Sequence, residues 1–207
     1  MPDTALQSSR LEFLPAPDHL DPPLGEVHVW RVELESAQRP AFRGGLRQVL
    51  ARYLAEGPEE IELTVGEHGK PRLAGEQLHF NLSHSGAMAL IAVCGDREVG
   101  VDVEQIKPGR DLIALAERAL LPADAAAVRE AAEAKREATF YRLWACHEAR
   151  LKCLGVGIGS LPPPGSPPVA VETLEVSPEH AAAVAVAGTA LLPLRGWTFD
   201  SPHPEDG

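Results

Sequence analysis

Val99-Gly100-Val101-Asp102-Val103-Glu104 is the stretch that decides the fold. Valines alternate with the other residues, so an extended backbone sends the valine side chains to one face and the two carboxylates to the other. We therefore expect a strand whose valines enter a core and whose Asp102 and Glu104 point at a shared site. Taken alone, an acidic pair on a strand most often belongs to a solvated face of a sheet.

A second stretch, Trp144-Ala145-Cys146-His147-Glu148-Ala149-Arg150-Leu151-Lys152, has helical spacing. Trp144, Glu148 and Lys152 recur every four residues, which stacks a ring, a carboxylate and an ammonium on one helix face. By default such a Glu and Lys form a surface ion pair worth roughly 0.2–0.5 kcal/mol. If the two stretches meet, three carboxylates and a lysine converge. Oxygen ligands in that number suit Mg²⁺, and the lysine would then answer a phosphate charge.

Composition excludes several classes of protein. The chain has 207 residues, of which 44% are hydrophobic and 24% charged, so a substantial core rather than a disordered chain is expected. A net charge of −11 argues against nonspecific nucleic-acid binding, which needs a basic footprint. The first residues, to about Pro23, have no basic start or apolar run, so the expected location is the cytoplasm, without a membrane partner. Cys94, Cys146 and Cys153 form no C-x-x-C pair and are expected as buried thiols.

Periodicity predicts a mixed chain of strands and helices. Alternating or continuous apolar patterns predict strands over 26–34, 61–65, 78–82, 87–94, 99–104, 169–176, 181–188 and 197–200. Helical spacing predicts helices over 42–55, 112–121, 122–138 and 140–154. Turns are expected at 68–71, 83–86 and 95–98, and the last would make the acidic strand one arm of a hairpin. The Ala-rich strands 87–94 and 181–188 fit either an internal duplication or shared composition alone.

Four blocks in this order resemble the 4′-phosphopantetheinyl transferases of the broad-specificity surfactin-type group. They are His68-Gly69-Lys70-Pro71, Phe80-Asn81-Leu82-Ser83-His84-Ser85-Gly86, Val99 to Glu104, and Trp144 to Lys152 followed by Gly155. The resemblance implies an α+β fold of two similar, pseudo-symmetric halves with the active site in the cleft between them. Residues 1–100 would carry the Arg43 helix, the Lys70 turn and the Ser83-His84 turn. Residues 101–207 would carry the acidic strand and the Glu148 helix, with a disordered tail at 201–207.

The resemblance also implies a reaction. A holo-[acyl-carrier-protein] synthase type of enzyme would use Mg²⁺, or Mn²⁺, to transfer 4′-phosphopantetheine from coenzyme A to a serine of an apo acyl, peptidyl or aryl carrier protein. Adenosine 3′,5′-bisphosphate would be released, and the enzyme would act as a monomer. The implied metal ligands are Asp102, Glu104 and Glu148. The implied catalytic residues are Asp102, Glu148 and Lys152, with Glu148 or a metal-bound water accepting the serine proton. The implied coenzyme A contacts are Arg43, Lys70, Pro71, Ser83, His84 and Lys152.

The chain departs from the family pattern in two places. His147 stands where the family usually has lysine, and the stretch 35–41 lacks most of the basic residues often found there. Two alternatives stay open, the first of them because of these departures. A degenerate homologue could bind coenzyme A or a carrier protein without transfer, and a metal-dependent pyrophosphohydrolase could use the same acidic triad.

Overall fold

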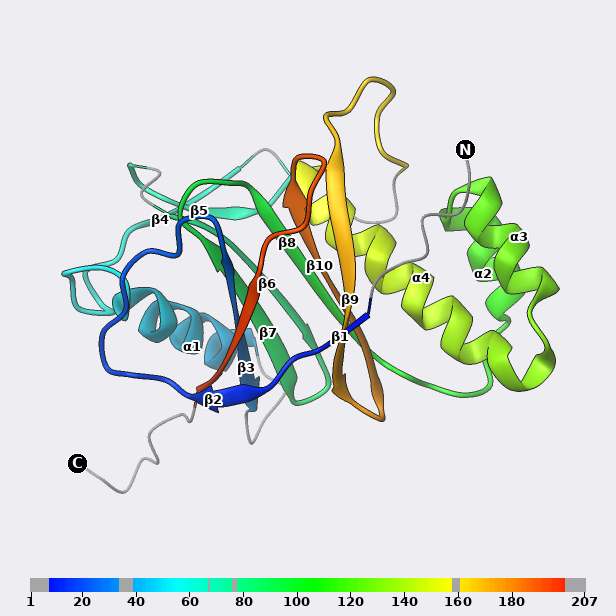
Figure 1. Cartoon of the computed structure of the whole chain (residues 1–207), viewed down its shortest axis with the longest axis horizontal. Helices are drawn as coiled ribbons and strands as arrows, with labels where there is room; N and C mark the ends of the chain where they lie inside the picture. The colour runs from blue at the N-terminus through cyan, green and yellow to red at the C-terminus, as the bar shows by residue number, and fades with distance from the viewer. Residues whose placement is uncertain (1–7, 34–38, 67, 76–77, 158–160, 200–207) are drawn as a thin grey trace.

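The computed structural model describes residues 8–33, 39–66, 68–75, 78–157 and 161–199, without the side chains of 39–43. In this part of the chain, four helices accompany a five-stranded, a four-stranded and a two-stranded sheet (Figure 1). The predicted mixture of helices and strands is confirmed. The predicted tail at 201–207 lies outside the described residues.

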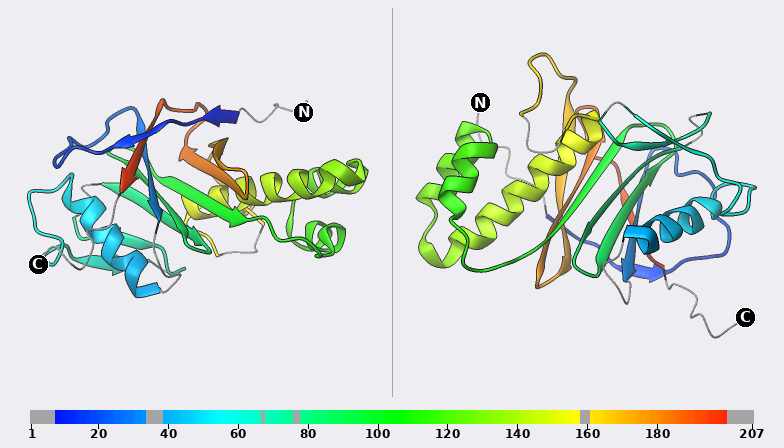
Figure 2. Two further views of the ribbon diagram at one scale, coloured as in Figure 1. Left: turned by 90° about the horizontal axis from the view of Figure 1, so that it is seen from below. Right: turned by 180° about the vertical axis from the view of Figure 1, so that it is seen from behind.

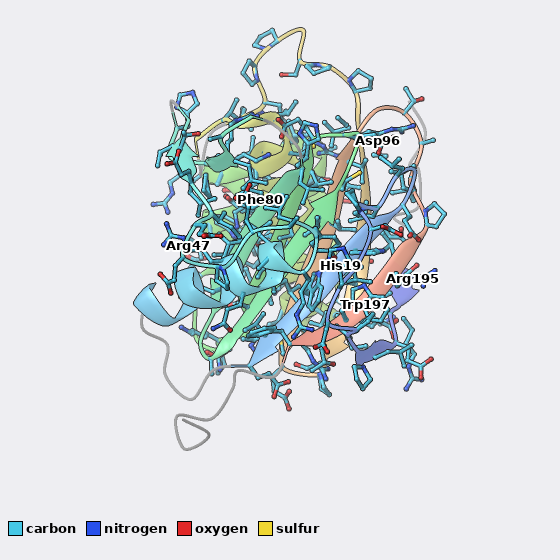
Figure 3. All side chains as sticks on the ribbon, turned by 90° about the vertical axis from the view of Figure 1, so that its left-hand side faces the viewer. His19, Arg47, Phe80, Asp96, Arg195 and Trp197 are labelled. Atoms are coloured by element: carbon cyan, nitrogen blue, oxygen red, sulfur yellow. The ribbon has the colours of Figure 1, made fainter. Side chains whose placement is uncertain are left out.

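The five-stranded sheet has the order β2-β11-β3-β7-β6 and is covered by α1, Arg39–Ala51. Its strands are β2 (Phe13–Pro15), β11 (Leu194–Phe199), β3 (Val27–Glu33), β7 (Met88–Cys94) and β6 (His79–Ser85). Leu46, Val49 and Leu50 of α1 pack against Trp30 and Trp197 of the sheet. Figure 3 looks onto α1, with Arg47 on the helix and Arg195 and Trp197 on β11 at its side.

The four-stranded sheet has the order β1-β9-β10-β8, and α4, Glu133–Leu154, contacts three of its strands. Its strands are β1 (Ser8–Arg10), β9 (Val169–Ser177), β10 (His180–Ala187) and β8 (Val99–Gln105). Ala145, Ala149 and Cys153 of α4 pack on Ala183 and Ala185 of β10. The small side chains on both surfaces let the helix lie close to the sheet.

A shared core joins the two large sheets. The valines of β8 pack with Val27 and Val29 of β3 and with Leu90 and Ala92 of β7. The alternate β7 residues Ile91 and Val93 face the other way, into the α1 core. Strand β7 is therefore buried on both faces, as its continuous apolar sequence predicts. The layers run α1, five-stranded sheet, four-stranded sheet, α4, and Figure 2 shows α1 and α4 on opposite sides of the strands.

Helices α2, Leu112–Ala119, and α3, Pro122–Glu130, pack against the first half of α4. The predicted division of this region into helices 122–138 and 140–154 is wrong. The break falls at 131–132, and α4 then runs for 22 residues. No Gly or Pro interrupts it, and Gly155, with φ of 70°, ends it in the left-handed conformation.

Two further predictions about strands are wrong. The acidic strand β8 forms no hairpin with β7, because it leaves that sheet and pairs antiparallel with β10. The predicted turn at 83–86 is also misplaced: Ser83 and His84 lie inside β6, and the chain turns at Gly86, with φ of 62°. The turn at 68–71 is confirmed between β4, Leu63–Val65, and β5, Pro71–Leu73.

Near both ends of the described chain, short strands join the large sheets beside partners that are distant in sequence. β1 pairs in parallel with β9, and β2 pairs in parallel with β11, so residues 8–15 contact both sheets. Likewise β11 joins the sheet of β3, far from it in sequence. Among the described helices, none is long and apolar enough to cross a membrane.

Candidate active site

The carboxylate face of β8 lies against α4. Gly100 alternates with Asp102 and Glu104, so all three residues share this face. A Cβ atom at Gly100 would collide with the backbone of Ala149 and Cys153. Only glycine allows this close approach, which brings the second half of α4 over the acidic strand.

Asp102, Lys152 and Ser83 meet at the centre of the site. The Lys152 Nζ atom lies 2.7 Å from Asp102 Oδ1 and 2.8 Å from Ser83 Oγ. The Ser83 hydroxyl in turn donates to Asp102 Oδ1 over 2.9 Å. Asp102 and Ser83 are 2% and 6% exposed, so this charged contact is shielded from water. Strand β8, helix α4 and strand β6 each supply one residue.

A row of side chains on β6 binds the free edge of β8, and we call it the β6 side-chain row. It consists of Asn81, Ser83 and Ser85. Their side-chain oxygens accept hydrogen bonds from the backbone N–H groups of Val101, Val103 and Gln105, at 2.9, 3.3 and 2.9 Å. These bonds replace a backbone ladder between the two sheets and satisfy N–H groups that burial would otherwise leave unpaired.

Glu104 lies beside Asp102 on the same face and is half-buried. Burial raises the pKa of this carboxyl, and the charge of Asp102 raises it further. The ammonium of Lys152 and a hydrogen bond from Trp144 act in the opposite direction. The centroid of the Trp144 ring lies 5.5 Å from that of Phe140, with the two rings tilted by 32°, so the ring that bonds Glu104 is itself held by packing.

Two further polar residues of α4 are buried: Glu148 is 2% exposed to solvent and His147 is 1% exposed. A lysine at position 147 would therefore have to bury its ammonium or extend it out of the core.

The carboxylate oxygens at this site are of the chemical type that binds a divalent cation. The second oxygen of Asp102, Oδ2, is buried without a hydrogen-bond partner within the described residues, which is costly unless a cation or polar group satisfies it. Carboxylate oxygens are the ligands that Mg²⁺ takes. No three His, Cys, Asp or Glu side chains of the described chain are already gathered closely enough to hold a metal ion. In the described arrangement, the positive charge of the Lys152 ammonium, rather than a metal ion, neutralises the negative charge of Asp102.

A second cluster of charges surrounds Glu98, just before β8. Lys70 Nζ lies 2.6 Å from one of its oxygens and Arg72 lies 2.6 Å from the other, while Lys70 also donates to the Val99 carbonyl over 2.9 Å. Burial alone would raise the pKa of Glu98, but its bonds to Lys70 and Arg72 outweigh burial and hold the pKa below its usual value. With Pro71 and His79, these residues line a small pocket.

The predicted site residues are thus distributed over two clusters. Ser83, Asp102, Glu104 and Lys152 come together, whereas Lys70 and Pro71 lie in the cluster around Glu98. His84 is exposed on β6, and the Arg43 side chain lies outside the described part of α1. Sequence reasoning missed Glu98, the Trp144 bond to Glu104, and the β6 side-chain row. The polar alternation at 81, 83 and 85 was the signal for that row.

The three cysteines are buried thiols, as predicted. Burial raises the pKa of Cys146 and Cys153 to about 12. Neither thiol is therefore a thiolate nucleophile near neutral pH.

Comparison with known proteins identifies the family of this chain. Residues 98–201, from just before β8 through β11, match the family model of the 4′-phosphopantetheinyl transferase superfamily. The 4′-phosphopantetheinyl transferase HetI of Nostoc sp. is 35% identical over 182 residues, which cover 72% of this chain and 77% of HetI. The chain belongs to this superfamily.

Two further phosphopantetheinyl transferases share the similarity. A 4′-phosphopantetheinyl transferase of Bacillus subtilis is 30% identical over 161 residues, covering 69% of this chain and 70% of the relative. AcpT of Salmonella typhi, named as a 4′-phosphopantetheinyl transferase, is 34% identical over 122 residues, covering 58% and 62%.

Proposed function

We propose that this chain transfers the 4′-phosphopantetheine group of coenzyme A to a serine of an apo carrier protein, in a Mg²⁺-dependent reaction that releases adenosine 3′,5′-bisphosphate. The observation that carries the proposal is the buried contact of Lys152 with Asp102, on the two elements that also carry Glu148 and Glu104. Membership of the 4′-phosphopantetheinyl transferase superfamily and the names of the relatives support it.

The carrier serine hydroxyl attacks the phosphorus on the pantetheine side of the pyrophosphate. The bond from that phosphorus to the bridging oxygen breaks, and the bridging oxygen leaves on the adenosine bisphosphate. Such a transfer depends on in-line positioning and on neutralising charge that spreads over the phosphoryl oxygens. Asp102, Glu104 and Glu148 would hold the Mg²⁺, which supplies that neutralisation when bound.

The chain's own residues do the rest. The Lys152 ammonium contacts the pyrophosphate and stabilises the leaving oxygen. Glu148, close to full burial on the same helix face, accepts the proton of the serine hydroxyl. We assign Arg43, Lys70, Pro71 and His84 to the adenosine and 3′-phosphate end of coenzyme A.

The finer features of the family form part of the same proposal. We propose the broad-specificity surfactin-type subgroup, acting on acyl, peptidyl or aryl carriers, as a monomer in the cytoplasm. The two pseudo-symmetric halves would be residues 1–100 and 101–207, with coenzyme A bound in the cleft between them, outside the core that the two large sheets share.

Transfer is tested by incubating the protein with fluorescent coenzyme A, Mg²⁺ and a panel of apo carrier proteins. Covalent labelling of the carrier serine is expected, and a carrier with that serine replaced by alanine serves as control. If no carrier in the panel is labelled, the proposal fails. Tight coenzyme A binding without labelling would indicate the binding-only alternative. Consumption of coenzyme A without any carrier would indicate a pyrophosphohydrolase.

A further inference from the structure

We propose that Ser83 is a positioning residue, which locks Lys152 and Asp102 together, rather than a contact for the adenosine end of coenzyme A. This inference rests on the proposed function, because it concerns the same site. It changes the role that the family resemblance implies for this serine.

The hydrogen-bonding capacity of Ser83 is already used. A serine hydroxyl has one donor and two acceptor positions. Its donor goes to Asp102 Oδ1 at 2.9 Å, and its acceptor positions take Lys152 Nζ at 2.8 Å and the Val103 N–H at 3.3 Å. With 6% of the residue exposed, no position remains for a phosphate or a ribose.

The position of Ser83 explains what this bonding accomplishes. The serine lies on β6 of the five-stranded sheet, whereas Asp102 lies on β8 of the other sheet and Lys152 on α4. One hydroxyl therefore fixes side chains from two other elements to a common point. A lysine side chain is long and flexible, so a second anchor beside Asp102 restricts where its ammonium can lie. Phosphoryl transfer depends strongly on such placement.

Ser85 provides a matched control on the same strand. Its hydroxyl accepts a hydrogen bond from the Gln105 N–H at 2.9 Å, as Ser83 does from Val103. Among the described contacts, it makes none with Asp102 or Lys152. Comparing Ser83→Ala with Ser85→Ala therefore separates the anchoring of β8 from the anchoring of Lys152.

The first measurement separates kcat from KM. For Ser83→Ala we expect kcat to fall about 10- to 100-fold, the effect of misplacing a reacting group, and any rise in KM for coenzyme A to be smaller, because only the Lys152 contact with the pyrophosphate is loosened. Ser85→Ala should keep kcat within about twofold, because it removes only a bond that anchors the strand. Ser83→Cys, whose somewhat larger thiol is only a weak donor and acceptor, should behave like Ser83→Ala and provides a second variant in case the first has a folding defect.

Two measurements need no turnover. Calorimetry with adenosine 3′-phosphate, which has the adenosine end of coenzyme A but lacks the pyrophosphate that Lys152 contacts, should give equal affinities for wild type and Ser83→Ala. Heteronuclear NMR should detect the Lys152 ammonium in wild type and Ser85→Ala, and lose it to rapid water exchange in Ser83→Ala. An unchanged ammonium signal in Ser83→Ala would overturn the proposal, as would a tenfold loss of adenosine 3′-phosphate affinity, or an equal loss of kcat in Ser85→Ala. A wild type that labels no carrier contradicts the proposed transfer, while the NMR comparison still tests the role of Ser83.

Discussion

At Asp102, burial and charge act against each other. A carboxylate that is only 2% exposed is costly unless its oxygens are satisfied. Lys152 and Ser83 satisfy one oxygen, whereas the other has no hydrogen-bond partner in the described chain. The oxygen that has no partner among the described residues therefore lowers the stability of the folded protein, and it favours the binding of a cation beside Asp102.

Replacing Asp102 by asparagine keeps the size of the side chain and removes its charge. We expect kcat to fall by about 10²–10³-fold or more, the range seen when one charge-stabilising group is removed from an active site. Carrier labelling under saturating coenzyme A measures this. Asp21→Asn, at an exposed position, should leave labelling unchanged. Labelling of wild-type strength in Asp102→Asn would eliminate Asp102 from the site.

His28 gives the protein a specific dependence on pH. Its Nδ1 atom lies 2.8 Å from the Tyr53 hydroxyl, which also accepts a hydrogen bond from Trp30. Burial raises the pKa of Tyr53, so the phenol stays protonated and donates to His28. Burial also lowers the pKa of His28, against the opposing effect of Glu26. The folded protein therefore holds His28 neutral.

The sign of the pH effect follows from linkage. The unfolded chain, with an ordinary histidine pKa of about 6.5, takes up the proton before the folded protein does. The His28 contribution to stability is present above this pH and is lost as the pH falls from about 6.5 through the lower folded pKa. Urea unfolding at pH 7.5 and 5.5 should show a smaller drop in His28→Gln than in wild type. His19→Gln, at an exposed position, should retain the full drop; an equal drop in His28→Gln would contradict the assignment.

At the level of the elements, the contact of α4 with β8 depends on one glycine. Gly100→Ala would push a methyl group into the backbone of α4. We expect the free energy of unfolding to decrease by about 1–3 kcal/mol, and turnover to fall because Lys152 and Glu148 move away from Asp102. Chemical denaturation and carrier labelling measure the two effects.

Gly44→Ala is the control for this substitution. Nothing lies within 4 Å of a Cβ atom at Gly44, which is in helix α1. Alanine there should stabilise the protein by up to about 1 kcal/mol, since it has a higher helix propensity. A Gly100→Ala protein as stable and active as Gly44→Ala would show that the close approach is not required.

The elements also show how far sequence reasoning reaches. Long periodic segments such as β3 and β7 were predicted because their apolar pattern directly reports the faces they bury. The division between α3 and α4 was missed because alanine, which fits a helix or its end, occupies both 131 and 132. The contact between the acidic strand and the Lys152 helix could be predicted. The sequence pattern, however, predicts a turn at Ser83, which lies inside β6. Its bonding depends on the crossing of β8 to the other sheet, and no local pattern encodes that crossing.

At the scale of the whole molecule, residues 8–15 connect the two large sheets. β1 and β2 have three residues each, so nothing in their own sequence identifies them as strands. Their partners, β9 and β11, come from the far end of the chain. Leu11 and Phe13 pack into the core that the sheets share. This short segment therefore stabilises the joint between the sheets.

Deleting residues 1–15 should weaken that joint. We expect the free energy of unfolding to fall by about 3 kcal/mol, the order expected for removing two large apolar side chains from a core. Urea denaturation followed by tryptophan fluorescence measures the loss. Deletion of residues 1–7, which removes neither strand, should cost less. Equal stability of the two truncated proteins would show that the connection contributes nothing.

The β6 side-chain row has a consequence beyond catalysis. Strand β8 is the outer strand of its sheet, and an outer strand with open N–H groups is a template on which strands of other molecules add. Asn81, Ser83 and Ser85 occupy these N–H groups with side chains that offer no continuing ladder. The residues that hold the two sheets together thus also protect the protein against aggregation.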